Sequence, residues 1–188
     1  LRSGETDHAA VARECRAVRN AVGLLDASTL GKIEAIGPDA AQFLDLLYTI
    51  DVTGLSPGRC RYVLLLGENG FVLDDGIVAR LAPDRFHITT TTGGAARVLH
   101  HMEDYRQTEF TNLKVWLTST TEQWGVVAVQ GPRSREVIAP LVEGIDLATM
   151  PHMSTRACRV AGIAARLFRA SFTGELGYEI NVPTGFPQ

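Results

Sequence analysis

Two neighbouring carboxylates, Asp74 and Asp75, stand among apolar residues after a tetrad, residues 67–70, that is rich in glycine and asparagine. An apolar run, residues 62–66, precedes the tetrad, so the sequence predicts two strands joined as a hairpin. Successive side chains of a strand point to opposite faces, so at most one of the two acids is buried beside Val72. A buried carboxylate has to be paired, neutralised or used chemically. Spacing alone leaves open that Asp74 pairs with an arginine and that Asp75 caps a turn.

A second candidate, Glu179, lies in an apolar stretch directly after a glycine-rich turn. A fixed carboxylate has two acceptor oxygens, so it can bind two adjacent donors on the edge of an amidine, a guanidine or a pterin-like heterocycle. The ring of Phe172 or Tyr178 would contact the face of the same heterocycle. The alternative is a salt bridge from Glu179 to Arg166 or Arg169.

The elements that must position these acids are short strands and helices. A helix capped by Asp7 and ended by Gly23 comes first, and a turn-rich connection over residues 24–32 follows it. Further helices are expected from Pro38 to residue 47, after residues 93–94 and over 133–141. Strands are expected at residues 32–36, 62–66, 72–78, 85–91, 113–117, 126–130, 158–161, 164–172 and 178–182. This order lacks βαβ regularity, which predicts an α+β fold of antiparallel sheets.

Residues 33–47 and 126–141 share one order of elements: a strand, a Gly-Pro pair and an amphipathic helix. The repetition predicts two similar lobes, residues 1–120 and residues 121–188. A ligand that touches both Asp74 and Glu179 would then lie between the lobes, where pockets commonly form.

Composition excludes several classes of function. The 188 residues are 45% hydrophobic and 21% charged, as in a globular protein with a core. A net charge of −3 without a basic run disfavours a nucleic-acid partner, and no apolar stretch approaches the roughly 20 residues of a membrane helix. Cys15, Cys60 and Cys158 are scattered, without a secretory signal, which predicts a cytoplasmic protein with free thiols and no metal site. No dinucleotide or ATP loop is found, so a small molecule of another kind is the expected partner.

The chain resembles the folate-binding aminomethyltransferases of the glycine-cleavage T-protein type from Val22 to Val182. Five motifs occur in family order: Val-Gly-Leu-Leu-Asp-Ala-Ser, Gly-Pro-Asp-Ala, Asn-Gly-Phe-Val-Leu-Asp-Asp, Val-Gln-Gly-Pro and Phe-Thr-Gly-Glu-Leu-Gly-Tyr-Glu-Ile. Within this family, the runs Asp-Ala-Ser-Thr-Leu-Gly-Lys-Ile-Glu and Thr-Ser-Thr-Thr-Glu-Gln-Trp are similar to the carboxyl-terminal part of the sarcosine oxidase alpha subunits.

The resemblance implies a role for each candidate residue. Asp74 becomes the catalytic carboxylate near the reactive nitrogens of tetrahydrofolate. Leu30 stands where the family often has a methionine against the ring system, and Thr91 stands where T-proteins have an asparagine that lines the pocket. T-proteins carry tyrosine at the position of Phe172, so the ring face is kept and the hydroxyl hydrogen bond is lost. The folate-binding residues implied in this way are Glu179, Leu30, Thr91, Phe172 and Tyr178.

The resemblance also implies an activity. The one-carbon unit released by oxidation of sarcosine would be captured on tetrahydrofolate as 5,10-methylenetetrahydrofolate, with flavin and NAD bound in other parts of a complex of sarcosine oxidase subunits. The alternatives are a glycine-cleavage-type aminomethyltransferase, a folate-dependent demethylase and a folate-binding module without catalysis. The folate domain of the family continues further, so the chain is expected to be a fragment.

Overall fold

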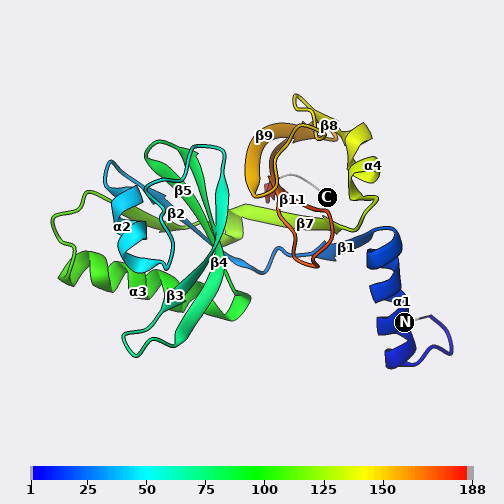
Figure 1. Ribbon diagram of the computed structural model, residues 1–188, viewed down its shortest axis with the longest axis horizontal. Helices are drawn as coiled ribbons and strands as arrows, with labels where there is room; N and C mark the ends of the chain where they lie inside the picture. The colour runs from blue at the N-terminus through cyan, green and yellow to red at the C-terminus, as the bar shows by residue number, and fades with distance from the viewer. Residues whose placement is uncertain (1, 186–188) are drawn as a thin grey trace. The chain divides into compact units, whose positions relative to one another are not determined.

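The computed structural model describes residues 2–185, which form two compact units (Figure 1). The central unit comprises residues 28–124 with residues 153–155. The terminal unit comprises residues 2–27, 125–152 and 156–185. The predicted division into lobes at residue 120 stays a prediction. The two compact units have other bounds, because residues 2–27 group with the later part of the chain.

The central unit is built on a five-stranded sheet with the strand order β3-β4-β5-β2-β6. Its strands are β2 (Gly31–Ile36), β3 (Cys60–Leu66), β4 (Val72–Ala82), β5 (Arg85–Thr90) and β6 (Trp116–Ser119). Its helices are α2 (Ala40–Leu47) and α3 (Ala95–Thr108), with short 3-10 turns η1 (Thr92–Gly94) and η2 (Thr121–Gln123). Phe43 of α2 and Met102 of α3 are fully buried against strand residues such as Ile88, so the helices close this core.

The predicted hairpin is present between β3 and β4, which pair in antiparallel fashion. The N–H of Gly67 donates to the carbonyl of Phe71 over 2.9 Å, and the N–H of Gly70 donates to the carbonyl of Gly67 over 2.8 Å. Gly70 has a φ of +78°, a conformation that glycine adopts without steric cost. The hairpin prediction is confirmed, and its turn fixes the register that places Asp74 opposite Leu65.

The terminal unit contains a six-stranded sheet with the order β1-β7-β11-β10-β9-β8. Its strands are β1 (Gly23–Asp26), β7 (Trp124–Gln130), β8 (Val142–Glu143), β9 (Ser154–Val160), β10 (Ile163–Arg169) and β11 (Gly177–Pro183). Its helices are α1 (Asp7–Asn20), α4 (Ser134–Ile138) and the 3-10 turn η3 (Ala139–Leu141). Leu167, Tyr178 and Ile138 lie at the centre of this core, with 0%, 0% and 1% of their surface exposed.

Two local predictions in this unit are wrong. The expected turn-rich connection begins as strand β1, in which Leu24 pairs with Val129 of β7. The sequence there does not alternate between apolar and polar residues, so the strand depends on this pairing and not on a local pattern. Leu24 is 71% exposed, as suits an edge strand. The first helix is capped by Thr6, whose hydroxyl accepts from the N–H of Ala9, whereas Asp7 is already its first helical residue.

The repeated order of elements is confirmed at both sites. Gly37 lies between β2 and α2 with a φ of +145°, and Gly131 lies between β7 and α4 with a φ of +132°. A Cβ on Gly37 would lie 2.2 Å from the carbonyl oxygen of Lys114, and one on Gly131 would lie 2.4 Å from that of Ala21. The glycine of each pair is therefore required by its φ and by close backbone approach.

The predicted class, α+β with two antiparallel sheets and helices, is confirmed. Over residues 2–185, no helix combines the length and the apolar character that a membrane crossing needs.

Candidate functional site

Asp74 and Asp75 lie on opposite faces of β4, as strand alternation predicts. Asp74 is 6% exposed, and its Oδ1 accepts a hydrogen bond of 2.7 Å from the hydroxyl of Thr91. Asp75 instead accepts a hydrogen bond of 2.7 Å from the hydroxyl of Tyr62, which is 57% exposed. Within residues 2–185, Asp74 forms no ion pair, so the structure does not contain the alternative in which an arginine pairs with it.

The second carboxylate oxygen of Asp74 has no partner among residues 2–185. Oδ2 is buried and accepts no hydrogen bond from any described residue. An oxygen of this kind costs free energy unless a ligand supplies a donor, because burial removes its water. Asp74 therefore has one oxygen fixed by Thr91 and one oxygen available for binding or proton transfer.

Gly94 lies directly against this free oxygen. A Cβ added to Gly94 would lie 2.1 Å from Asp74 Oδ2 and 2.7 Å from Thr91 Oγ1. Gly94 ends η1 and is buried, and its φ of −88° is open to any residue. The glycine is therefore needed here for space beside the carboxylate, not for a special backbone conformation.

The segment that carries Leu30 is tied to the same region. The hydroxyls of Thr29 and Thr92 are 3.1 Å apart, which joins the Leu30 segment to the turn after Thr91. Lys32 has no exposed surface, and its ammonium donates to the carbonyls of Ser28 and Leu30 over 2.8 and 2.9 Å. Leu30 itself is half-buried. The structure thus brings Asp74, Thr91 and the Leu30 segment together within the central unit.

A buried phenol shares the sheet face of Asp74. Tyr48 bridges Leu65, which in turn pairs with Asp74, so the three residues are lateral neighbours. Burial, aided by the negative charge of Asp74, raises the pKa of the Tyr48 phenol. Tyr48 is 7% exposed and stays protonated at neutral pH, so it can donate a proton in a hydrogen bond but does not act as a base.

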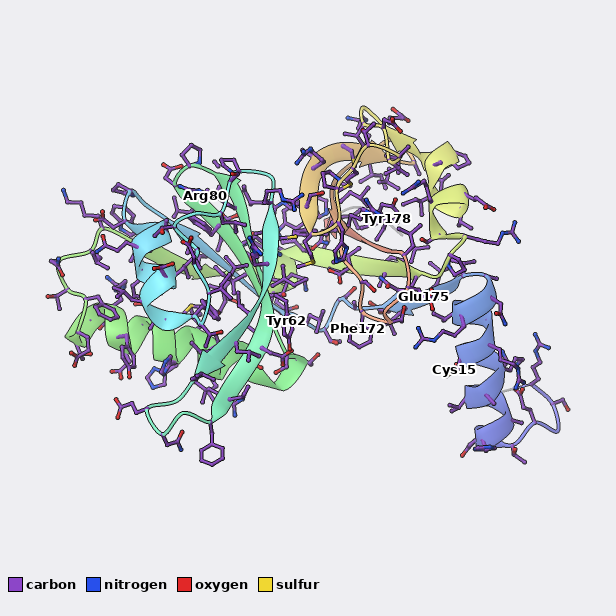
Figure 2. All side chains as sticks on the ribbon, in the orientation of Figure 1. Cys15, Tyr62, Arg80, Phe172, Glu175 and Tyr178 are labelled. Atoms are coloured by element: carbon purple, nitrogen blue, oxygen red, sulfur yellow. The ribbon has the colours of Figure 1, made fainter. Side chains whose placement is uncertain are left out.

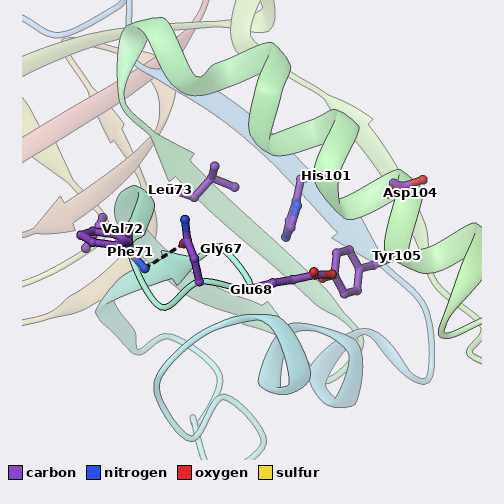
Figure 3. A pocket seen from close by; sticks show the side chains of 9 residues that line it. Gly67, Glu68, Phe71, Val72, Leu73, His101, Asp104 and Tyr105 are labelled. Carbon is purple, nitrogen blue, oxygen red and sulfur yellow. Dashed lines mark hydrogen bonds between the residues drawn. The ribbon is translucent and has the colours of Figure 1, made fainter.

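A separate cavity of about 630 Å³ lies between the hairpin turn and α3 (Figure 3). Glu68 and Tyr105 face each other in this cavity, with the phenol donating to Glu68 Oε1 over 3.0 Å. Burial lowers the pKa of His101, against the opposing influence of Asp104 and Glu68. Asp74 is not among the residues that line this cavity, so its free oxygen does not open into it.

Glu179 lies in β11 of the terminal unit, and none of the described residues is a charged partner for it. Its neighbour across the strands is Phe168 of β10, which is 2% exposed. Burial raises the pKa of Glu179. Among residues 2–185, no hydrogen bond or ion pair reaches its carboxylate, so the alternative of a salt bridge to Arg166 or Arg169 is absent there. Glu179 is a partly buried acid whose acceptors are available to a ligand.

Phe172 and Tyr178 differ sharply in exposure although both are aromatic (Figure 2). Phe172 lies between β10 and β11 and is 76% exposed. Tyr178 has no exposed surface, and its hydroxyl accepts a hydrogen bond of 3.1 Å from Nε of Arg135. The ring of Tyr178 therefore belongs to the core in this structure, and its expected contact with folate stays a prediction.

Sequence reasoning missed two residues that shape these sites. Gly94 precedes the first residue of α3, as expected, but its second role, leaving space beside Asp74, was missed. Gln130 of the Val-Gln-Gly-Pro motif was passed over, and its side chain is buried at 2% exposure beside the Phe172 segment. The available signal was a glutamine at the end of an apolar strand, because a buried amide requires partners.

Comparison with known proteins places the chain in a family. Residues 3–188 match the family described as GCVT N-terminal domain, and the chain belongs to that family. It is 52% identical over 184 residues to a sarcosine oxidase subunit alpha of Corynebacterium sp. (strain P-1), an alignment that covers 96% of this chain. The same alignment covers 19% of that relative, so the chain spans about a fifth of its length.

Two solved structures share the fold. The glycine cleavage system aminomethyltransferase T of Bartonella henselae superposes with a TM-score of 0.80 at 28% identity, over 92% of this chain and 45% of that chain. A heterotetrameric sarcosine oxidase of Corynebacterium sp. U-96 gives a TM-score of 0.60 at 16% identity, over 97% of this chain and 88% of that chain. The second likeness supports the fold alone.

Proposed function

We propose that this chain forms the tetrahydrofolate-binding, one-carbon-transfer part of a sarcosine oxidase. In this role it captures the one-carbon unit released from sarcosine as 5,10-methylenetetrahydrofolate. The observation that carries the proposal is the carboxylate of Asp74, with one oxygen held by Thr91 and the other buried without a partner in the part of the chain that the structure describes. The identity to a sarcosine oxidase subunit alpha supports the choice of reaction.

The described residues fit tetrahydrofolate. Folate supplies a weakly basic amine as nucleophile, and positive charge appears at its nitrogen during attack on the one-carbon unit. A preorganised carboxylate at Asp74 stabilises that charge and accepts a proton at Oδ2. Removing one preorganised electrostatic group of this kind commonly costs on the order of 10²- to 10³-fold in rate.

The proposed binding residues have complementary tasks. Glu179 offers two acceptor oxygens to adjacent donors of a pterin edge, and both are free for that purpose because no residue among 2–185 pairs with them. Phe172 offers an exposed ring for the face of the heterocycle. Leu30 and Thr91 complete the proposed set beside Asp74.

The test compares Asp74→Asn with its neighbour Asp75→Asn in the protein assembled with its flavin-bearing subunits. With sarcosine and tetrahydrofolate present, the products measured are 5,10-methylenetetrahydrofolate and free formaldehyde. We expect Asp74→Asn to shift the product toward formaldehyde while sarcosine oxidation continues, because the amide keeps the size of the side chain and loses its charge. Asp75→Asn should behave as the unchanged protein, because Asp75 lies on the other face of β4.

Equal capture of the one-carbon unit by Asp74→Asn and the unchanged protein would remove Asp74 from the mechanism. Methylene transfer from an aminomethyl donor in place of sarcosine would favour a glycine-cleavage-type aminomethyltransferase, and methyl transfer to folate would favour a demethylase. Folate binding without any transfer would favour the non-catalytic module. The proposed partners are tetrahydrofolate and other sarcosine oxidase subunits, which would hold the flavin and NAD.

A further inference from the structure

The segment between β10 and β11, residues 170–176, is here called the Phe172 loop. It carries the aromatic side chain of Phe172, labelled in Figure 2. This residue is 76% exposed. An exposed ring on a loop is useful for binding when the backbone beneath it is fixed, because ordering a mobile loop on binding costs affinity. The contacts beneath Phe172 therefore decide whether its ring is preorganised.

Gln130, the last residue of β7, makes these contacts from the sheet. Its Oε1 accepts a hydrogen bond of 3.2 Å from the N–H of Phe172 and one of 3.4 Å from the hydroxyl of Thr173. The side chain is buried, with 2% exposed. One amide oxygen thus holds the backbone of the residue that carries the exposed ring.

The nitrogen of the same Gln130 amide is unfavourably placed. Nε2 of Gln130 is buried and donates to no described residue. A Cβ on Gly177 would lie 2.2 Å from Oε1 and 2.4 Å from Nε2, so β11 begins with the residue that leaves room for the amide. A buried donor without a partner is unfavourable, so the gain from Gln130 has to come from its oxygen and the loop that the oxygen holds.

Other residues hold the rest of the Phe172 loop. Nη1 of Arg19 donates to the carbonyl of Thr173 over 2.7 Å and to Glu175 Oε1 over 2.9 Å. The carbonyl of Leu176 accepts from the N–H of Gly131 over 2.8 Å and from the hydroxyl of Ser134 over 3.1 Å. These contacts fix the loop after Phe172 and leave the amide of Phe172 itself to Gln130.

We propose that Gln130 is a positioning residue, which fixes the Phe172 backbone so that the exposed ring is preset for the face of a flat heterocyclic ligand. The inference rests on the proposed function in that the ligand would be the pterin of tetrahydrofolate. Gln130 does not touch the ligand in this account, and it acts through Phe172.

The first test measures hydrogen exchange of the Phe172 amide in Gln130→Met, which keeps the length of the side chain and removes its acceptor. We expect exchange at Phe172 to accelerate roughly tenfold or more, in line with the loss of ordinary hydrogen bonds, while the Ile180 amide in β11 keeps its protection. Ser134→Ala is the matched control, since Leu176 keeps its bond from Gly131 and Phe172 keeps Gln130. Unchanged exchange at Phe172 in Gln130→Met would overturn the proposal.

If Gln130→Met fails to fold, Thr173→Val tests the same contact from the loop. It removes one of the two hydrogen bonds to Gln130 Oε1 and should accelerate Phe172 exchange by a few fold. If the Phe172 amide exchanges in Thr173→Val as slowly as in the unchanged protein, the proposal that Gln130 fixes the Phe172 backbone is contradicted.

The second test is a double-mutant cycle on the dissociation constant of tetrahydrofolate, with Gln130→Met, Phe172→Ala and the combination. We expect Gln130→Met alone to weaken binding roughly tenfold and to have little further effect when Phe172 is already alanine. Additive effects would overturn the claim that Gln130 acts through Phe172. No binding by the unchanged protein would overturn the proposed function, whereas the exchange experiment would still decide whether Gln130 positions Phe172.

Discussion

Gly94, which lies beside the proposed catalytic carboxylate Asp74, gives a sharp prediction. Gly94→Ala places a Cβ 2.1 Å from Asp74 Oδ2, whereas ordinary van der Waals contact begins at 3.4 Å. The oxygen must therefore move by about 1.3 Å, the difference between these two distances. A displacement of roughly 1 Å at a reacting group can lower a rate on the order of 10²-fold. We expect a loss of this size in one-carbon transfer to tetrahydrofolate.

The fold should tolerate the same substitution. Gly94 has a φ of −88° and a ψ of −18°, a helical conformation in which alanine is ordinarily favoured over glycine by roughly 0.5–1 kcal/mol. That gain offsets part of the cost of displacing the Asp74 side chain. Gly94→Ala should therefore unfold at a denaturant concentration close to that of the unchanged protein, while its transfer activity falls.

Gly93→Ala supplies the matched control. Gly93 belongs to the same 3-10 turn, and a Cβ there would meet no atom within 4 Å. The assay follows 5,10-methylenetetrahydrofolate formation and denaturant unfolding for both alanine variants. If Gly94→Ala transfers the one-carbon unit as fast as Gly93→Ala, the free oxygen of Asp74 is not the reacting atom and the mechanism proposed here is wrong.

Three further predictions concern the residues around the two acids. Thr91→Val removes the hydrogen bond to Asp74 Oδ1 and should lower one-carbon transfer roughly tenfold in the same assay, whereas Thr108→Val, as control, removes a hydroxyl bond within α3 and should leave transfer nearly unchanged. Glu179→Gln should weaken tetrahydrofolate binding by roughly 1–3 kcal/mol in a titration, because the amide opposes one ligand donor with its own; an unchanged dissociation constant would remove Glu179 from the site. Without folate, the same variant should be more stable than the unchanged protein at neutral pH, because burial raises the pKa of Glu179 from its ordinary value of 4.5. Below the unfolded pKa, Glu179 is neutral in the folded and the unfolded protein, and as pH rises through the higher folded pKa the unchanged protein loses stability. The stability advantage of Glu179→Gln should therefore grow with rising pH, and an advantage that shrinks would contradict this account.

Local rules explain what the sequence predicted correctly. The split of Asp74 and Asp75 follows from strand alternation, and the hairpin follows from the glycine and asparagine of its turn. The contacts of Gln130 could not be predicted in the same way, because they join residues more than 40 positions apart. Strand β1 was not predicted for a related reason, because its partner β7 begins about 100 residues later in the chain.

The polar groups without partners connect the stability of this chain with its proposed role. Asp74 Oδ2 and Gln130 Nε2 are buried without partners among residues 2–185, and the Glu179 carboxylate is partly buried without one. Each is unfavourable for the unliganded fold, and each would be easily relieved by an apolar or neutral side chain. A sequence usually departs from good packing where a ligand or a reaction requires the departure. Substitutions at Asp74 and Glu179 that remove the charge should therefore stabilise the unliganded chain, and they should lower folate binding or one-carbon transfer.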